Sequence, residues 1–360
     1  MKREILFFAA LSIIILLFLS DCHKNPVEPP FNIRNLTWTI DTLAHPDNWQ
    51  TLIRDIWGIS ANDVYAVGFA NTTRGILWHY NGKKWTDVKI SITQGGPISG
   101  VINFDDVFGF GKNDVWICGD RGVDNPNPPP DFYHKKLLIH WDGRKWEDVA
   151  TPDGYALFSI WGNSPDNVWF CGAFGTLFHY DGTIVKSDTV PLKIPLYNVS
   201  DMWIFLSITG NETESDMLLW GNKVNASYYY LFNYHDNKWV IADSTFFHSS
   251  RKLWMSPSGT LYSIGETTYK RQGNTWTKIL DWHTLEAFEI TGTDDDNLFA
   301  VGIGKPPGDL GAVMHYNGSN WFSYKETEIP GAIFYDVWTD GKEVFVVGNI
   351  GYTSIVLHGK

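Results

Sequence analysis

Seven positions at regular intervals along the chain carry side chains that could do chemistry together. Each lies two residues before a recurring aromatic or threonine residue, and five of the seven are acidic. Carboxylate oxygens are the ligands that Ca²⁺ prefers, so these side chains predict a Ca²⁺ or ligand site if the repeats surround one axis. The alternative is that each carboxylate bonds backbone groups of a neighbouring repeat or faces water. The acidic members are Asp55, Asp106, Asp201, Glu289 and Asp336, and the other two positions hold Ser159 and Lys252.

Histidine recurs in the same repeats. Zinc needs ligands gathered at about 2 Å from one centre, whereas one histidine per repeat is spread around a ring, so we expect a structural role. The chain has no Ser-His-Asp order, phosphate-binding glycine loop or Cys-x-x-Cys pair, and we therefore predict no catalytic residues. The histidines are His79, His140, His179, His315 and His358.

The repeat that positions these residues has two halves. The stretch "DIWGISANDVYAVG" at 55–68 returns as "DVFGFGKNDVWICG" at 106–119 and "SIWGNSPDNVWFCG" at 159–172. The second half, "ILWHYNGKKWTDV" at 76–88, carries an Asn-Gly or Asp-Gly pair, which is typical of a tight hairpin with positive φ at both residues. The first half recurs at 57, 108, 161, 203, 254, 291 and 338, a spacing typical of four-stranded propeller blades.

The sequence therefore predicts an all-β fold, a seven-bladed β-propeller with four-stranded blades. The last repeat ends at 354–360 without a fourth strand, while Trp38-Thr39 matches Trp85-Thr86 of the first repeat. We expect the N-terminal strand, 36–43, to complete the last blade and close the ring, which removes an open sheet edge. The recurring Trp is expected to fill the gap between blades, and the Gly after the second strand to start a turn.

The N-terminal segment has a different character. Lys2 and Arg3 precede an apolar run at 5–19, shorter than the roughly 20 residues that span a bilayer, and "LSDC" ends at Cys22. This resembles a bacterial lipoprotein signal, except that Asp21 stands where a small residue is usual; simple secretion is the alternative. We expect a signal peptide at 1–21, lipidated Cys22 with a Pro-rich tether at 22–35, and the propeller at 36–360. We expect Cys118 and Cys171 to be buried free thiols rather than a disulfide.

The repeat "WGxSxxDVxAVG … HYDGxxW" resembles that of bacterial surface propellers, many of them lipoproteins. The fold that it implies is similar to kelch/galactose-oxidase and sialidase-type propellers. The "HYNGKKW" hairpin also resembles the sialidase Asp-box, with His where that box has Ser or Thr. The resemblance implies a fold and a bacterial outer-membrane lipoprotein, periplasmic or at the cell surface, but one fold hosts many functions.

The loops opposite the short turns are long and varied, which is where binding usually lies. Five aromatic residues there predict a protein or glycan site: Trp49, Tyr133, Tyr155, Tyr197 and Trp282. A net charge of −12 argues against nucleic acid as a partner. The sequence favours a monomeric, membrane-anchored, non-catalytic binding or scaffold propeller that needs no cofactor beyond channel Ca²⁺. The alternative is a carbohydrate-active enzyme (glycoside hydrolase, lyase or glycosyl transfer) using acidic residues near the channel mouth.

Overall fold

The structure is a computed structural model that describes residues 31–44, 48–71, 75–90, 98, 100–126, 132–192, 203–211, 217–223, 229–244, 250–281, 283–304 and 310–360. The chain divides into two compact units, Met1–Asn35 and Leu36–Lys360. In the first unit the described residues include one short 3-10 turn, η1 (Ile33–Asn35). Among the described residues, no helix has the length and apolar character to cross a bilayer.

The second unit is built from antiparallel sheets, which follow the chain from the innermost strand outward except where β1 forms the outermost strand of the last sheet. Sheet one holds β2 (Thr51–Ser60), β3 (Asp63–Ala70), β4 (Gly75–Tyr80) and β5 (Trp85–Asp87). Sheet two holds β6 (Val101–Gly111), β7 (Asp114–Asp124), β8 (Phe132–Trp141) and β9 (Trp146–Asp148). Sheet three holds β10 (Leu157–Ser164), β11 (Asn167–Gly172), β12 (Leu177–Tyr180) and β13 (Val185–Ser187). Sheet four holds β14 (Trp203–Thr209), β15 (Met217–Lys223), β16 (Tyr229–His235) and β17 (Lys238–Asp243).

The remaining sheets follow the same order. Sheet five holds β18 (Ser250–Met255), β19 (Leu261–Gly265), β20 (Thr268–Gln272) and β21 (Thr275–Leu280). Sheet six holds β22 (Leu285–Asp294), β23 (Asn297–Gly304), β24 (Leu310–Tyr316), β25 (Trp321–Ser323) and, after the 3-10 turn η4 (Lys325–Thr327), β26 (Ile329–Pro330). Sheet seven holds β27 (Ala332–Thr339), β28 (Val344–Ile350), β29 (Thr353–Gly359) and β1 (Trp38–Thr42).

The prediction of seven four-stranded blades is wrong, because the strands that the structure describes form six four-stranded blades. Sheet six differs because β26 pairs with the start of β24, through Leu310↔Pro330 and Gly311↔Ile329. β25 pairs only with Met314–Tyr316, so the first half of β24 would otherwise be an open edge. The repeat pattern in the sequence did not distinguish β26 from β27, the innermost strand that follows it.

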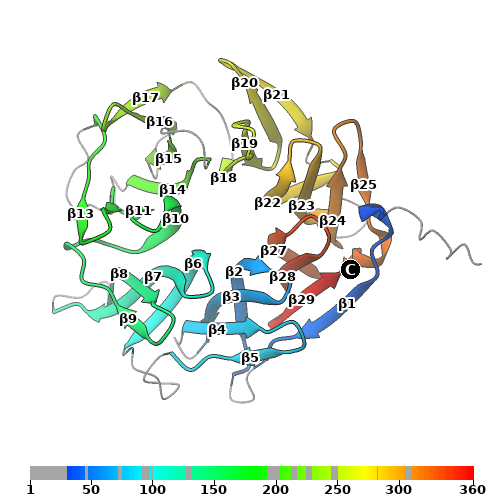
Figure 1. Ribbon diagram of the computed structural model, residues 1–360, viewed down its shortest axis with the longest axis horizontal. Coiled ribbons are helices and arrows are strands. Elements are labelled where there is room, and N and C mark those ends of the chain that lie inside the picture. The colour runs from blue at the N-terminus through cyan, green and yellow to red at the C-terminus, as the bar shows by residue number, and fades with distance from the viewer. Residues whose placement is uncertain are drawn as a thin grey trace, which may run out of the picture. The chain divides into compact units, whose positions relative to one another are not determined.

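The innermost strands contact one another in the closed order β2, β6, β10, β14, β18, β22, β27 and back to β2, as Figure 1 shows. The expected closure by the N-terminal strand is present. β1 pairs with β29 from Trp38↔Gly359 to Thr42↔Ile355. Thr37 and Lys360 extend this pairing by exchanging backbone hydrogen bonds of 2.8 and 3.1 Å. The apolar core lies between neighbouring sheets: Ile53 and Val64 of sheet one pack with Phe345 and Val347 of sheet seven.

Every innermost strand has a β-bulge at the same place. In β2 it falls between Ile53, which pairs with Gly68, and Asp55, which pairs with Val67. The bulge brings the Leu52 carbonyl so close that a Cβ on Gly68 would meet its oxygen at 1.9 Å. Gly68 is therefore required by close backbone approach inside a strand, and the expectation that the recurring Gly starts a turn is wrong there. Gly172 and Gly265, by contrast, are the last residues of their strands.

The Asn-Gly and Asp-Gly hairpins are also built differently from expectation. Gly82 has φ +83°, whereas Asn81 is not among the positive-φ residues, and the loop comprises residues 81–84. The Asn81 side chain supplies the turn, since its Oδ1 accepts the backbone N–H groups of Lys83 and Lys84, both at 3.1 Å. The same pattern recurs at Asp142, Asp181 and Asn317.

Candidate functional site: the inner ring and the central cavity

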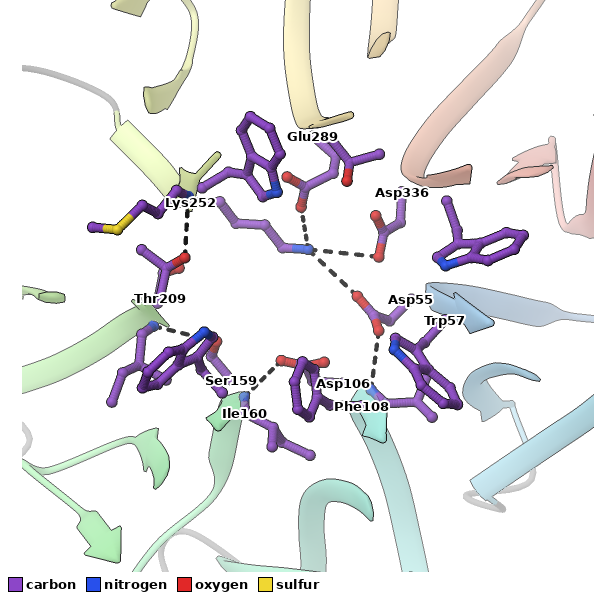
Figure 2. A pocket seen from close by; sticks show the side chains of 18 of the residues that line it. Asp55, Trp57, Asp106, Phe108, Ser159, Ile160, Thr209, Lys252, Glu289 and Asp336 are labelled. Carbon is purple, nitrogen blue, oxygen red and sulfur yellow. Dashed lines mark hydrogen bonds and ion pairs between the residues drawn. The ribbon is translucent and has the colours of Figure 1, made fainter. Parts of the chain in front are cut away.

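The residue directly after each bulge points toward the axis of the closed strand ring, and these residues form what we call the inner ring. A bulge re-aims the side chain that follows it, and the residues in this position all line one cavity. Figure 2 shows Asp55, Asp106, Ser159, Lys252, Glu289 and Asp336 around that cavity. The inner ring consists of Asp55, Asp106, Ser159, Ser207, Lys252, Glu289 and Asp336.

Six of these residues were predicted from the sequence, and one was not. The position in sheet four is held by Ser207, which pairs with Trp220 after the bulge as Asp55 pairs with Val67. Asp201 was assigned to this position because Trp203 was taken for the recurring aromatic residue, and Asp201 lies outside the described residues. The correct match is Thr209-Gly210, which resembles the Thr291-Gly292 of sheet six.

The acceptors of the inner ring link neighbouring sheets. Asp55 Oδ2 accepts the backbone N–H of Val107 in the next sheet at 2.9 Å, and Asp106 Oδ2 accepts that of Ile160 at 2.7 Å. The same link runs from Ser159 to Ile208 at 3.3 Å, from Ser207 to Leu253 at 3.1 Å and from Asp336 to Ile56 at 3.2 Å. The expectation that these side chains bond backbone groups of a neighbouring repeat is confirmed at these positions.

Lys252 interrupts the pattern because an ammonium group cannot accept a hydrogen bond. By the pattern of the other sheets, Lys252 would accept the backbone N–H of Ile290. That N–H donates instead to Glu289 of its own strand at 2.9 Å. The Lys252 Nζ lies 2.6 Å from Glu289 Oε2, 3.4 Å from Asp55 Oδ1 and 3.7 Å from Asp336 Oδ2. Figure 2 shows this side chain reaching across the axis to these carboxylates. The Lys252 ammonium thus partly neutralises three carboxylates, each of which comes from a different strand.

Burial governs the protonation of the inner ring. It raises the pKa of Asp106 and Asp336 well above the usual range, and the nearby Asp55 carboxylate raises both further. Burial also raises the pKa of Glu289, although Lys252 acts in the opposite direction. The attraction of these carboxylates raises the pKa of Lys252 well above its usual value, although its own burial opposes this. The buried carboxyl groups of Asp106, Glu289 and Asp336 therefore release their protons less readily than exposed ones, whereas Lys252 keeps its proton more readily.

A cavity of about 660 Å³ extends from the inner ring toward the ends of the innermost strands, where each turns into the next strand. Its walls are aromatic, and its floor is polar, formed by the inner ring. The exposed Ile59 lies at the turn end of this lining. The aromatic residues of the wall are Trp57, Phe108, Phe110, Trp161, Trp254 and Trp338. The volume lies within the range of ligand pockets in proteins.

The wall explains why glycine follows the recurring aromatic residue. A Cβ on Gly58 would meet the Trp338 ring of the preceding sheet at 3.0 Å, and one on Gly109 would meet Trp57 at 2.8 Å. A Cβ on Gly210 would meet Trp161 at 2.3 Å. The recurring Trp residues therefore lie across the glycine of the next sheet, beside the cavity.

In two sheets the recurring aromatic residue is replaced by threonine, and the glycine of the following sheet is then absent as well. Thr209 and Thr291 hold the aromatic position in their sheets, and the next sheets have Met255 and Thr339 where glycine stands elsewhere. Where one sheet has the smaller threonine in place of the aromatic residue, the next sheet thus has a residue with a side chain in place of glycine. The two threonines line the cavity, so its wall lacks the recurring aromatic side chain at sheets four and six.

The other chemistry-bearing residues have structural partners. His79 donates to Asp63 at 2.7 Å and stacks on Tyr65 with ring centroids 4.4 Å apart, and His140 does the same with Asp114 and Trp116. Among the described residues there is no group of three or more His, Cys, Asp or Glu side chains placed to hold a metal ion. Binding of Ca²⁺ in the channel stays a prediction. Cys118 and Cys171 are free and buried, as expected.

Three of the aromatic residues predicted for a loop-face site lie among the described residues. Trp49 is 66% exposed and packs edge-on against Tyr352, with ring centroids 5.1 Å apart. Tyr155 packs against Phe174 at 4.6 Å, and Tyr133 lies in β8 opposite Val123. Tyr197, Trp282 and Cys22 lie outside the described residues. A ligand site on that face stays a prediction.

The ordered sheets and the closed ring of inner strands define the class of protein, a β-propeller. The chain is similar in structure to "YCF48 bound to D1 peptide", with 14% identity, a TM-score of 0.61 and coverage of 89% of this chain and 96% of that chain. It is similar to virginiamycin B lyase from Staphylococcus aureus, with 12% identity, a TM-score of 0.59 and coverage of 89% and 99%. It is also similar to an ulvan lyase, with 11% identity, a TM-score of 0.52 and coverage of 88% and 92%.

No protein-family model matches the chain, and no curated protein matches it. At such low identities the structural likeness shows the fold alone. The neighbours include a protein solved with a peptide and two lyases, so the fold is compatible with both binding and catalysis.

Proposed function

We propose that this chain is a non-catalytic binding propeller whose ligand enters the central cavity, held at a membrane through lipidated Cys22. The observation that carries the proposal is the aromatic wall around a cavity of about 660 Å³, contributed by several separate strands. Aromatic side chains offer large contact area at low conformational cost, and pockets lined by them with a few polar groups are typical ligand sites. A protein or a glycan fits this description.

The floor of the cavity favours binding over catalysis. The carboxylates of Asp55 and Asp106 accept backbone N–H groups of the next sheet, and Glu289 is held by Lys252 at 2.6 Å. A general acid or base must be free to exchange a proton with the substrate. These groups instead tie the sheets together, which makes the inner ring a structural floor.

One observation favours the alternative of a carbohydrate-active enzyme. The pKa of Asp106 is raised well above its usual range by burial and by Asp55, which is the direction that a general acid requires. Glycoside-hydrolase chemistry needs such an acid paired with a second carboxylate. Turnover of any polysaccharide that is abolished by Asp106→Asn, with ligand affinity retained, would establish the enzyme and refute the binding module.

The test of binding uses peptide and glycan arrays with the full chain and three variants. Trp338→Ala removes a cavity wall, whereas Trp49→Ala and Tyr133→Ala remove loop-face side chains. We expect Trp338→Ala to abolish binding and the two loop-face variants to retain it. Binding that survives Trp338→Ala but is lost in Trp49→Ala or Tyr133→Ala would move the site to the loop face.

A further inference from the structure

The chemistry of the cavity selects a ligand by charge. Aromatic faces attract cations, with Trp the strongest, and four of the wall residues are Trp57, Trp161, Trp254 and Trp338. The floor beneath them has four carboxyl groups, those of Asp55, Asp106, Glu289 and Asp336, against the single ammonium of Lys252. Both surfaces favour positive charge.

A further positive charge at the floor of the cavity would be stabilised by the carboxyl groups there. The pKa of Asp106 and Asp336 is raised by burial and by Asp55, because neighbouring carboxylates repel one another. Lys252 forms ion pairs with Asp55, Glu289 and Asp336, whereas it acts on Asp106 through a longer-range attraction that lowers the pKa of that group. A second cation near Asp106 would relieve the same repulsion that Lys252 relieves at Glu289.

The size of the cavity decides between a lone ion and a larger ligand. A volume of about 660 Å³ is far more than one ion needs, and aromatic walls give no oxygen ligands to a metal. At Thr209 and Thr291 the wall has a smaller side chain than the recurring aromatic residue, which leaves room beside the Trp rings. A chain with a long apolar stem and a charged end fits walls that are apolar and a floor that is acidic.

We propose that the central cavity binds a short segment of a basic polypeptide, with an arginine or lysine side chain directed at the Asp55–Asp106 side of the inner ring. This inference rests on the proposed function and adds the chemistry of its ligand. The guanidinium or ammonium group lies at the acidic floor, the stem passes between the Trp rings, and the backbone of the segment stays at the mouth.

The test titrates the full chain with acetylated, amidated glycine peptides of five residues whose central residue is arginine, lysine, citrulline or glutamate. Quenching or shift of tryptophan fluorescence reports occupancy of the aromatic cavity. We expect the arginine and lysine peptides to bind at least tenfold more tightly than the citrulline and glutamate peptides. Their affinity should fall as salt is added.

A matched pair of variants isolates the charge of the floor. Ser159→Asp adds a carboxylate at the one inner-ring position between Asp106 and Ser207, where it can accept the Ile208 N–H as Ser159 does. Ser159→Asn has the same shape without the charge. We expect arginine peptide to bind several-fold more tightly to Ser159→Asp than to Ser159→Asn, and citrulline peptide to show no such difference.

The outcomes separate this inference from the proposed function. Equal binding of arginine and citrulline peptides, or no binding of either basic peptide, overturns the basic ligand. Array binding of a neutral glycan that is lost in Trp338→Ala would still support the cavity as the site. Ligand binding that survives both Trp338→Ala and the cavity-filling pair Thr291→Trp with Thr339→Gly overturns the cavity itself.

Discussion

Lys252 of β18 and Glu289 of β22 form an ion pair of 2.6 Å across two sheets, at the place in the inner ring where the backbone links are broken. At five inner-ring positions a side chain of one sheet accepts an N–H of the next, as Asp55 does from Val107. Beyond Glu289 the Val337 N–H donates instead to Asp336 of its own strand at 2.6 Å. Between sheets five and six this link is impossible, because lysine has no acceptor. The ion pair replaces it and places a positive charge among carboxylates that burial alone would neutralise by protonation.

Replacing Lys252 with Met should therefore destabilise the chain by about 3 kcal/mol at pH 8, because it leaves buried carboxylates without their cation. The loss should be smaller at pH 5. Acids whose pKa is raised in the folded state stabilise it only while protonated, so stability falls as the pH rises above their unfolded pKa of about 4. The pKa of Asp336 and Glu289 is already raised by burial, and loss of Lys252 raises it further.

Urea denaturation of both proteins at pH 5 and pH 8 measures this difference. Lys252→Met combined with Glu289→Gln should recover part of the loss. Equal stability of the single variant and the wild type at pH 8 would show that the ion pair has no net effect on stability. The same variant tests the Ca²⁺ prediction, since a vacated cation position should make its thermal stability respond to added Ca²⁺.

Gly68→Ala should be severely destabilising, by about 4 kcal/mol or more, because the new Cβ meets the Leu52 carbonyl oxygen at 1.9 Å. Gly111→Ala is the matched control, with no heavy atom within 4 Å of the new Cβ. We expect the control to lie within about 0.5 kcal/mol of wild type. Thermal melts compare the two, and a stable Gly68→Ala protein would mean that the bulge can relax.

Thr291→Trp should destabilise the chain by about 1–3 kcal/mol through overpacking, because Thr339 occupies the space that glycine leaves in other sheets. Adding Thr339→Gly should restore stability, since Trp338 fits across Gly58 in this way. A double-mutant cycle from denaturation curves gives the coupling energy. Additive effects of the two changes would contradict the pairing of aromatic residue and glycine between sheets.

Cys118 and Cys171 should resist alkylation in the native state. Both are buried, and burial raises the pKa of each thiol well above its usual value, so the reactive thiolate is scarce. Mass spectrometry of tryptic peptides after iodoacetamide treatment, with and without urea, measures modification at each site. Modification of either residue at the same rate in both conditions would show that its position opens without unfolding.

Much of the fold could be predicted because the repeat unit is also the packing unit. The period located every innermost strand except β14, and the match of Trp38 to Trp85 predicted the pairing of β1 with β29. Asp201 was wrongly assigned to the inner ring because Trp203 was taken for the recurring aromatic residue of sheet four. The match between a large residue in one sheet and glycine in the next would have selected Thr209, because Met255 follows it.

The candidate site was less predictable. The direction of each inner-ring side chain depends on a bulge of one residue. Such a bulge cannot be recognised in the pattern of apolar residues, and the Gly opposite it is its one sign in the sequence. The cavity lies toward the short turns, whereas loop length directed attention to the other face. Lys252 was visible in the sequence, but its partners come from β2, β22 and β27 and meet only when the ring closes.

The pairing of β1 with β29 also determines the order in which the protein can be completed. Thr39 donates its side-chain hydroxyl to the carbonyl of His358, a residue 319 positions later. During synthesis β1 leaves the ribosome early and waits for a partner that is made after every other strand. Because such non-local pairing slows folding, we expect closure of the ring by β1 to be a late step.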